Sequence, residues 1–538
     1  PPVFYGGIKL KAQIDKTTGN WILPVPANKS TALALTINNN LVPIVSTGSN
    51  KFYNVGKVDY IKQNDSSLVK IAIPNDLNQT LKDLPKEQWA NLYANFYVKW
   101  TNVIAKIIDY SYAGAYFQIK VGKIPNHLLI DQKSRYRILN GADKLEKGDW
   151  YYKNESTIVY KPRDSDKIEK DDVYYPLLNR FLSIDGGEIK TVDNYYFSNI
   201  IFNTGGKKMN DNGFFSHQAA EELEAVIELN YTKNITFDNI QIRNVLSNAI
   251  WIKKMNENDR FVNSIVANNG AGSVKVGNAG SKENELTNKV FIENNKIYNG
   301  GLIYQSAPGI IILQAKNTTV KNNDIENYGY TGISIGMRHS PLGFPVNNYV
   351  GYNSIDNIGR GELDDMAGIY TLGGSDSTTI YNNVITNVKA LNYGGHGLYS
   401  DGGSKDIILK NNLVYNCSHA GYHTNESFGT KFFNNYLIDN GVGLESWHYG
   451  KGSIELSKNV IINNGNINNP DWNSINKKQD ASNVFIDQNQ GANARSLTST
   501  TNIMLKKESF YYVPTVLAAF KSKGIDIVDF SKVGLIKK

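Results

Sequence analysis

One stretch of the sequence, residues 361–447, indicates the fold of the whole chain. It contains four similar segments: GELDDMAGIYTLGG (361–374), YGGHGLYSDGGS (393–404), AGYHTNES (420–427) and GVGLESW (441–447). In each, a glycine is followed by a short run of alternating side chains. Alternation with a period of two is typical of a β-strand, and glycine and asparagine are typical of the turns between strands. The stretch therefore predicts a series of short strands of similar design.

A second repeated element lies between these segments: an asparagine, any residue, and then Ile, Val or Leu. It starts at Asn295, Asn323, Asn353, Asn383, Asn412, Asn435 and Asn459. Subtraction gives spacings of 28, 30, 30, 29, 23 and 24 residues. Asn199, Asn239 and Asn263 continue the pattern upstream less evenly. A regular period of this length is typical of a repeat architecture.

The repeats predict a right-handed parallel β-helix, an all-β solenoid. Each repeat holds short runs of Ile, Val, Phe and Tyr separated by Gly, Asn and Asp, with no helical period. Such a coil cannot bury its apolar face alone, so neighbouring coils must stack. We expect the repeated asparagine to accept turn conformations and to hydrogen-bond the asparagine of the next coil.

The pattern divides the chain into three parts. Residues 1–185 lack it and show alternating β segments, which predict a capping strand followed by a β-sandwich-like accessory domain. Residues 186–480 form the predicted β-helix, and residues 481–538 the predicted C-terminal cap over its exposed end. Within the first part LPKEQWANLY predicts a helical turn, and within the last VPTVLAAFKSKG predicts a short helix.

Composition narrows the class of protein further. The net charge is +7, from 57 Lys and Arg against 50 Asp and Glu, and no basic run marks a nucleic-acid surface. The single cysteine, Cys417, excludes an intramolecular disulfide. No stretch approaches the ~20 apolar residues of a membrane span. The chain starts at Pro1, so we expect a removed leader and a secreted or periplasmic monomer.

Strand alternation places candidate functional residues on one outer face of the predicted β-helix. Counting from Gly368, Gly397, Gly421 and Gly443, the first and third residues point inward, and the second and fourth point outward. The outward residues are Tyr370, Tyr399, His423 and Glu445 at the second position and Asp401, Asn425 and Trp447 at the fourth. Aromatic rings stack on sugar rings, and paired carboxyls perform acid, base or nucleophilic steps on glycosidic bonds. The face therefore predicts a carbohydrate site.

Other interpretations of the same residues remain open. Singly, Asp401 in SDGGS is typical of a turn, Asp364–Asp365 of an exposed loop, and His423 of a surface imidazole. A calcium-dependent lyase would need converging carboxylates and a basic residue, for which the chain offers Glu362, Asp364, Asp365, Arg338 and Arg360. A zinc site from His396, His419, His423 and His448 would draw on different strand phases.

The segments LDDMAGIYTLGG and YGGHGLYSDGGS, with the His-containing strand that follows, resemble bacterial β-helical glycoside hydrolases of family 141, which includes α-L-fucosidases and xylanases. Lacto-N-biosidases of family 136 are more distantly similar. RYRILNGADKLEKGDWYYKNESTIVYKP (135–162) resembles the segment that precedes the β-helix in these proteins, so the resemblance covers roughly residues 130 to 440. The family commonly has Glu at the position of Gly402 and Gly at that of Ala367.

The resemblance implies a pair of catalytic aspartates, carried over by motif onto Asp365 and Asp401. We expect Asp365 to be the acid/base and Asp401 the nucleophile, with Glu445 as the reserve carboxylate. The two can approach only if the loop GRGELDD folds over the strand face. The sugar site would be lined by Tyr370, His396, Tyr399, His423, Glu445 and Trp447.

The sequence thus predicts a secreted glycoside hydrolase acting on a complex glycan, without metal or cofactor. The separation of the two carboxyls, about 5–5.5 Å or 6.5–9.5 Å, would decide between retention and inversion at the sugar. A polysaccharide lyase on the same fold and a non-catalytic glycan-binding protein are the alternatives.

Overall fold

The structure of the 538-residue chain is a computed structural model. It describes all residues except 28–29, 48–51, 63–65, 123, 142–144, 169, 337–344, 448–451, 463, 466–474, 480–481, 487–504, 507–508, 511–524, 527 and 537–538. Arg338, His448 and the helix predicted from VPTVLAAFKSKG lie outside the described residues.

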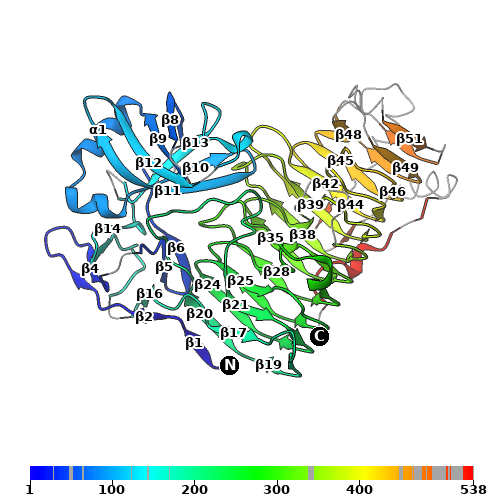
Figure 1. Ribbon diagram of the computed structural model, residues 1–538, viewed down its shortest axis with the longest axis horizontal. Helices are drawn as coiled ribbons and strands as arrows, with labels where there is room; N and C mark the ends of the chain where they lie inside the picture. Colours follow the sequence, from blue (N-terminus) through cyan, green and yellow to red (C-terminus); the bar gives the residue numbers. More distant parts are fainter. Residues whose placement is uncertain are drawn as a thin grey trace.

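The larger part of the molecule is a parallel β-helix (Figure 1). Successive coils contribute strands to three long parallel sheets of 12, 10 and 11 described strands. The 12-stranded sheet contains β1 (Val3–Tyr5), β20 (Ile201–Gly205), β24 (Gln241–Val245), β27 (Ile265–Ala267), β31 (Lys296–Tyr298), β35 (Asp324–Tyr328), β38 (Ser354–Ile358), β41 (Val384–Val388), β44 (Leu413–Tyr415), β47 (Tyr436–Ile438), β50 (Val460–Ile462) and β52 (Val484–Ile486). The predicted all-β fold is confirmed.

The 10-stranded sheet carries the candidate site. Its strands are β17 (Leu182–Asp185), β21 (Ala225–Asn230), β25 (Asn248–Ile252), β28 (Val274–Val276), β32 (Ile310–Ile312), β36 (Ile333–Gly336), β39 (Ala367–Leu372), β42 (His396–Ser400), β45 (Ala420–Asn425) and β48 (Val442–Trp447). The first strand, β17, lies a few residues before the position 186 at which the sequence predicts the β-helix to begin.

The 11-stranded sheet completes the coils. It contains β19 (Tyr196–Ser198), β23 (Thr236–Asp238), β26 (Arg260–Val262), β30 (Phe291–Glu293), β34 (Thr319–Lys321), β37 (Tyr349–Gly351), β40 (Thr379–Tyr381), β43 (Ile408–Lys410), β46 (Thr430–Phe433), β49 (Ser453–Ser457) and β51 (Asn476–Gln479). Short pairs lie beside it: β18 (Val192–Asp193) with β22 (Thr232–Lys233), and β29 (Thr287–Asn288) with β33 (Ala315–Lys316). A third pair is β53 (Leu505–Lys506) with β54 (Ser509–Phe510).

Asparagines hydrogen-bond from coil to coil, as predicted. In the buried ladder that starts at Asn295, the backbone N–H and the side-chain amide of Asn383 both donate to Oδ1 of Asn412 at 3.0 Å. The residue before each ladder asparagine, rather than the ladder asparagine itself, adopts the turn conformation: Asn382 and Asn411 have φ of 55° and 59°. The predicted roles of turn and ladder are thus divided between adjacent residues.

The glycine that opens each site strand is required by close packing. A Cβ on Gly397 would lie 2.1 Å from Cγ1 of Val414 and 2.8 Å from the carbonyl oxygen of Gly421 on the next coil. The residues that follow the glycines pack inside the β-helix as predicted, since Ile369, Leu398 and Leu444 are each at most 1% exposed. The glycine spacing therefore fixes which side chains point outward on the same strands.

The N-terminal region is built from antiparallel sheets. A seven-stranded sheet contains β7 (Tyr53–Asn54), β13 (Arg135–Leu139), β10 (Tyr93–Val98), β11 (Thr101–Ser111), β12 (Tyr116–Gly122), β9 (Ser66–Ala72) and β8 (Val58–Lys62). Two four-stranded sheets contain β14 (Trp150–Asn154), β15 (Thr157–Tyr160), β4 (Trp21–Pro24) and β3 (Gln13–Ile14), and β2 (Gly7–Lys9), β16 (Val173–Pro176), β5 (Ala34–Ile37) and β6 (Asn40–Pro43). The described helices are α1 (Asn75–Asp83) and the 3₁₀ turns η1 (Lys86–Asn91), η2 (Asn126–Leu128), η3 (Glu283–Glu285) and η5 (Phe530–Lys532). The turn predicted in LPKEQWANLY is η1.

The N-terminal sheets lie along the first part of the β-helix, and the last coils extend beyond them (Figure 1). The first strand, β1, pairs with β20 and so covers the free edge of the 12-stranded sheet. At the turn between β10 and β11, the carbonyl of Lys99 accepts a hydrogen bond from the Asp364 N–H. The accessory region thereby contacts the loop that precedes β39.

The described part of the C-terminal segment runs along the outside of the β-helix. Ile525, Val528 and Phe530 pack with Tyr436 and Val460 of the 12-stranded sheet. Further on, the Gly534 N–H donates to the carbonyl of Tyr352, several coils earlier. These residues therefore pack on a lateral face, and most of the predicted cap, residues 481–538, lies outside the described residues. No helix among the described residues is long and apolar enough to cross a membrane.

Candidate active site

Strand register brings the predicted outward residues together. Tyr370 on β39 pairs with Tyr399 on β42, Tyr399 with His423 on β45, and His423 with Glu445 on β48. Two residues further along the same two strands, Asn425 pairs with Trp447. We call the following residues the site cluster: Asp365, Tyr370, His396, Tyr399, Asp401, His423, Glu445 and Trp447. The register thus assembles residues that are 22 to 29 positions apart in the chain.

The floor of the cluster is more buried than an outward strand face suggests. Tyr370 and Tyr399 are 2% exposed and His423 is fully buried. The rings of Tyr370 and Tyr399 meet edge to face at 4.9 Å, and those of Tyr399 and His423 at 4.6 Å. These side chains point away from the β-helix interior and are buried against one another. Asp365 and Trp447 at its margin remain partly exposed.

Asp401 lies at the end of β42 and is held by three hydrogen bonds. Its Oδ2 accepts from the Tyr370 hydroxyl at 2.5 Å. Its Oδ1 accepts from the side-chain amide of Asn425 and from the backbone N–H of Gly402, both at 2.7 Å. The bond to Gly402 is the turn contact expected of an aspartate in SDGGS. Tyr370 and Asn425 come from neighbouring coils, so Asp401 also has the fixed position that a reacting carboxylate needs.

Asp365 reaches the cluster because its loop folds across the strand face. Its backbone is left-handed, with φ of 55°, and its N–H donates to the carbonyl of Tyr393. Burial and the negative charge of Asp401 raise the pKa of Asp365 to about 7, although the Tyr399 hydroxyl opposes the shift. Its Oδ1 has no hydrogen-bond partner in the described structure. The charge of Asp401 thus contributes to the raised pKa of Asp365, and the catalytic pairing of the two aspartates stays a prediction.

The neighbouring carboxylate, Asp364, has a structural role instead. Its Oδ1 accepts from the backbone N–H groups of Asn392 and Tyr393 at 2.6 and 3.2 Å, and its Oδ2 accepts from the Asn392 side chain. These bonds hold the 392–394 turn against the loop that carries Asp365. The sequence alone does not separate the two adjacent aspartates, whereas their hydrogen bonds do.

Glu445 is engaged with two histidines. It lies 3.2 Å from His419 Nε2 and 2.8 Å from His423 Nδ1. Burial raises the pKa of Glu445, but the hydrogen bonds with His419 and His423 outweigh burial and hold this pKa below its usual range. The hydrogen bond to Glu445 raises the pKa of His419, whereas burial lowers the pKa of His423. Glu445 therefore stays ionised as the partner of imidazoles, a different state from that of Asp365.

His396 completes the cluster from the start of β42. Its ring stacks on His423 with centroids 4.3 Å apart and planes 9° apart. The Ala420 N–H donates to its Nδ1, so the neutral ring carries its proton on Nε2. Burial lowers the pKa of His396 well below its usual range. Its Nε2 is buried and has no partner among the described residues, so a donor of the cluster is left unsatisfied.

The histidines also permit a test of the metal alternatives. Among the described residues, the one group of three close potential ligands is His396, His423 and Glu445, with ligand atoms within 4.8 Å of one another. The lone pair of an imidazole nitrogen lies in the ring plane, and two stacked parallel rings cannot both aim at one ion. The arrangement does not fit a metal unless a ring turns. Glu362, Asp364 and Asp365 do not form such a group.

Several residues near the cluster were not predicted from the sequence. Gln218, in the excursion between β20 and β21, donates to the hydroxyls of both Tyr330 and Tyr370, at 2.9 and 3.1 Å. Tyr330 donates to the carbonyl of Asp365. Tyr393 lies at 6.0 Å from Trp447, ring to ring. The available signal was the 40-residue gap between Asn199 and Asn239, which requires an excursion but does not show where it goes.

Comparisons with known proteins agree with the fold. A family model described as "Right handed beta helix region" matches residues 224–388 and 286–467, which gives the β-helix its predicted hand. A solved structure titled "Glycoside hydrolase" has a TM-score of 0.69 at 17% identity, over 80% of this chain and 82% of the other. One titled "The complex structure of XylC with xylose" has a TM-score of 0.41 at 11% identity, over 81% and 74%.

A mannuronan C-5 epimerase module from Azotobacter vinelandii is also similar, with a TM-score of 0.28 at 14% identity over 51% of this chain and 71% of the other. No curated protein matches the sequence significantly. At these identities the likeness concerns the fold, so the activity must be argued from the site.

Proposed function

We propose that the protein is a glycoside hydrolase that uses Asp365 and Asp401 on a complex glycan. One observation carries this proposal. Two carboxyls from different coils interact in one aromatic cluster, where burial and the charge of Asp401 raise the pKa of Asp365 to about 7. Paired carboxyls in unequal environments are the usual means of dividing acid and nucleophilic roles.

The environments assign the roles. Asp365 holds a proton near neutral pH and is partly exposed, so it can protonate the leaving glycosidic oxygen. Asp401 accepts three hydrogen bonds, which fix its carboxylate in position to act as nucleophile or water-activating base. In the return step Asp365, now deprotonated, takes the proton from water. Sugar contacts would come from Trp447 and from the unsatisfied Nε2 donor of His396.

The proposed setting follows from the substrate class. A hydrolase of complex glycans acts where those polymers are, so we propose a secreted or periplasmic monomer, as the sequence predicts.

The test is hydrolysis of a panel of aryl glycosides, plant cell-wall glycans and host glycans by the wild type and by Asp365→Asn and Asp401→Asn. We expect both substitutions to lower kcat/KM by about 10³-fold or more. Asp356→Asn is the matched control, because it removes an aspartate from β38, on the 12-stranded sheet. Release of sugar by the wild type with near-full activity in either site variant would overturn the aspartate pair.

The same panel separates the alternatives. A lyase would release an unsaturated product that absorbs in the ultraviolet, with no water incorporated. A glycan-binding protein would bind a panel member and leave it intact. For an active wild type, incorporation of ¹⁸O from labelled water into the new reducing end would support hydrolysis.

A further inference from the structure

A cavity lies between the accessory region and the β-helix. Its volume is about 450 Å³, within the usual range of small-molecule sites. One wall comes from β6, β10 and β13 and the 146–149 turn, and the other from residues 302–305 and from Arg360 and Glu362. None of the site cluster lines it. It is therefore distinct from the proposed catalytic site.

Two of the three guanidinium groups that line this cavity have no ion pair or side-chain hydrogen bond among the described residues. Arg137, Arg163 and Arg360 all line it. No ion pair or side-chain hydrogen bond joins Arg137 or Arg163 to any described residue, and the Arg137 Nε–H is buried without an acceptor. Arg137 is instead held against the ring of Phe52, at 3.7 Å. A buried N–H that is fixed in place and lacks an acceptor is costly unless a ligand supplies one.

The other charges of the cavity are largely engaged with one another. Arg360 donates to the carbonyls of Gly300 and Gly301 and lies 3.4 Å from Glu362. Lys147 pairs with Asp164. Two further carboxyls, of Glu146 and Asp149, line the cavity, and Asp149 accepts from the Glu146 N–H. The lining cations that have no ion pair among the described residues are the half-buried Arg137 and the exposed Arg163, whose guanidiniums are suited to a carboxylate.

The remaining lining is suited to a sugar ring. Asn95 and Gln305 bond to each other at 3.3 Å and present amide groups, and Tyr97 adds a phenol. Leu33, Val42 and Ile303 supply an apolar wall for C–H faces. We propose that this cavity binds an acidic saccharide unit, with its carboxylate on Arg137 and Arg163. The inference rests on the proposed function for the ligand class and identifies the glycan as one that carries uronic acids.

The cavity shares a loop with the proposed catalytic site. Arg360 and Glu362 line the cavity, and Asp365 follows three residues later. The Arg135 guanidinium donates to the carbonyls of Gly361 and Glu362, so the accessory region holds this loop. An acidic unit in the cavity would lie beside the segment that places the catalytic acid.

The test is isothermal titration calorimetry of the full chain with glucuronic acid, with glucose and inorganic phosphate as separate ligands at matched ionic strength. We expect saturable binding of glucuronic acid that Arg137→Gln and Arg163→Gln each weaken about 10-fold or more. Arg260→Gln is the matched control. Arg260, on β26, pairs with Glu293 on β30 and does not line the cavity. Thermal unfolding checks that each variant is folded.

Three results would overturn the inference: no saturable binding of glucuronic acid, equal binding of glucose, or binding unaffected by the Arg137 and Arg163 variants. Phosphate that binds as tightly as glucuronic acid and displaces it would identify a general anion site and also overturn the saccharide assignment. Asp401→Asn must retain binding. The proposed saccharide cavity can therefore be confirmed even if no hydrolysis is found. The proposed hydrolase activity can likewise be confirmed even if the cavity binds no saccharide.

Discussion

The outer face of the 10-stranded sheet has two polar ends built on one column of residues. Register runs from Glu228 through Trp251 to Lys275, and onward through Ile311 and Ser334 to the site cluster. Both ends therefore occupy the same position in the coil. They differ in how their charges are satisfied, and this difference separates a structural network from a functional one.

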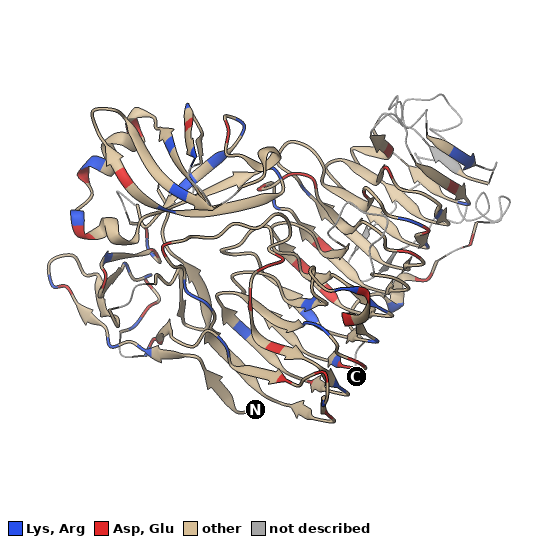
Figure 2. Ribbon diagram, in the orientation of Figure 1, with Lys and Arg blue, Asp and Glu red and all other residues tan. Residues whose placement is uncertain are grey.

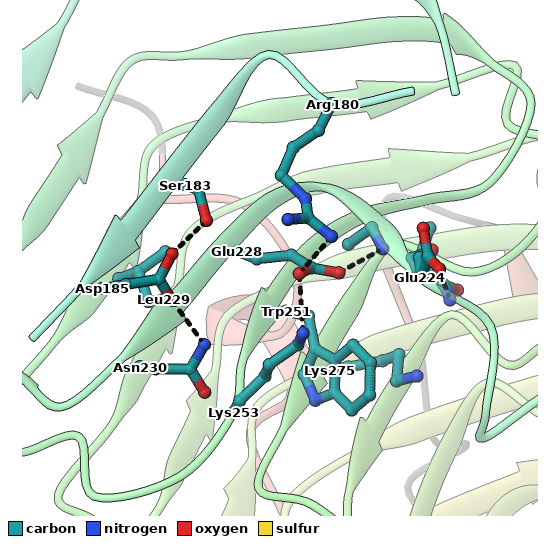
Figure 3. A network of polar contacts seen from close by, with 12 residues as sticks. Arg180, Ser183, Asp185, Glu224, Glu228, Leu229, Asn230, Trp251, Lys253 and Lys275 are labelled. Carbon is teal, nitrogen blue, oxygen red and sulfur yellow. Dashed lines mark hydrogen bonds and ion pairs between the residues drawn. The ribbon is translucent and has the colours of Figure 1, made fainter. Parts of the chain in front are cut away.

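At the early end, every labelled charge has a partner (Figure 3). Glu228 is 1% exposed and lies 2.6 Å from both Arg180 and Lys253. Lys275 donates to the carbonyls of Glu221 and Leu223, and its Nζ lies 3.5 Å from the centre of the Trp251 ring. Burial lowers the pKa of Lys275 to about 7, yet its donors are occupied. Although Arg180 Nε has no partner among the described residues, this end of the column is a network of paired opposite charges that anchors the excursion.

At the late end, like charges lie together and polar atoms remain without partners. Asp365 and Asp401 repel each other, and His396 Nε2 and Asp365 Oδ1 have no described partner. Uncompensated burial is unfavourable for folding and is common at functional sites. Charge alone does not distinguish the ends, because acidic and basic residues are interspersed over the molecule (Figure 2).

The largest expected effect is the loss of activity on substitution of Asp401 at the late end, measured together with stability. Asp401→Asn should lower kcat/KM on a hydrolysed panel member by about 10³-fold or more while the melting temperature changes little, because the amide can keep most of the hydrogen bonds. Steady-state kinetics and thermal unfolding of the same samples measure both. A large fall in melting temperature with retained activity would place Asp401 with the structural networks.

Glu228→Gln should give the opposite result. The substitution leaves Arg180 and Lys253 without their buried carboxylate, and we expect the free energy of unfolding to fall by about 2 kcal/mol, less than for a fully buried pair because both partners are partly exposed. Denaturant unfolding measures it. Activity below the melting temperature should be unchanged. The control is Glu257→Gln, which breaks an exposed pair with Lys233 and should cost about 0.5 kcal/mol or less.

The pH dependence should show the raised pKa of Asp365. As the acid, it must be protonated, so kcat/KM should fall about 10-fold per pH unit above about pH 7. The native state keeps a proton that the unfolded chain loses near pH 4, so this group's contribution to stability falls as pH rises from about 4 to 7. Asp365→Asn should therefore be more stable relative to wild type at pH 8 than at pH 4. An unchanged stability difference would contradict the shift.

The repeats predict most of the fold because their constraints are local and recur. A glycine such as Gly397 and a ladder asparagine such as Asn383 each face a similar neighbour on every coil, so spacing alone reveals the stack. The same alternation predicts Tyr370, Tyr399, His423 and Glu445 as one column. Their burial was not predictable, because it depends on loops that have no period.

The loops also account for what the sequence left open at the site. The motif resemblance selects Asp365, but residue type and spacing do not distinguish it from Asp364, which the structure shows bonded to the 392–393 turn. The sequence predicts His396 and His423 at different strand phases of one sugar site, and in the structure their rings stack. Gln218 arrives from an excursion about 150 residues away in sequence from Tyr370. Contacts of this kind depend on tertiary packing rather than on local pattern.

The smallest expected effect tests whether that excursion belongs to the catalytic end of the column. Gln218 donates to the Tyr370 hydroxyl, which donates to Asp401, so it positions the carboxylate through one intermediate. Gln218→Ala should lower kcat about 10-fold with little change in KM, since one polarised hydrogen bond is worth roughly 1–1.5 kcal/mol. Asn212→Ala is the control, an exposed residue of the same excursion. A purely structural role would lower the melting temperature and leave kcat intact, and Gln218 would then belong with the Lys275 contacts that anchor the excursion to the sheet.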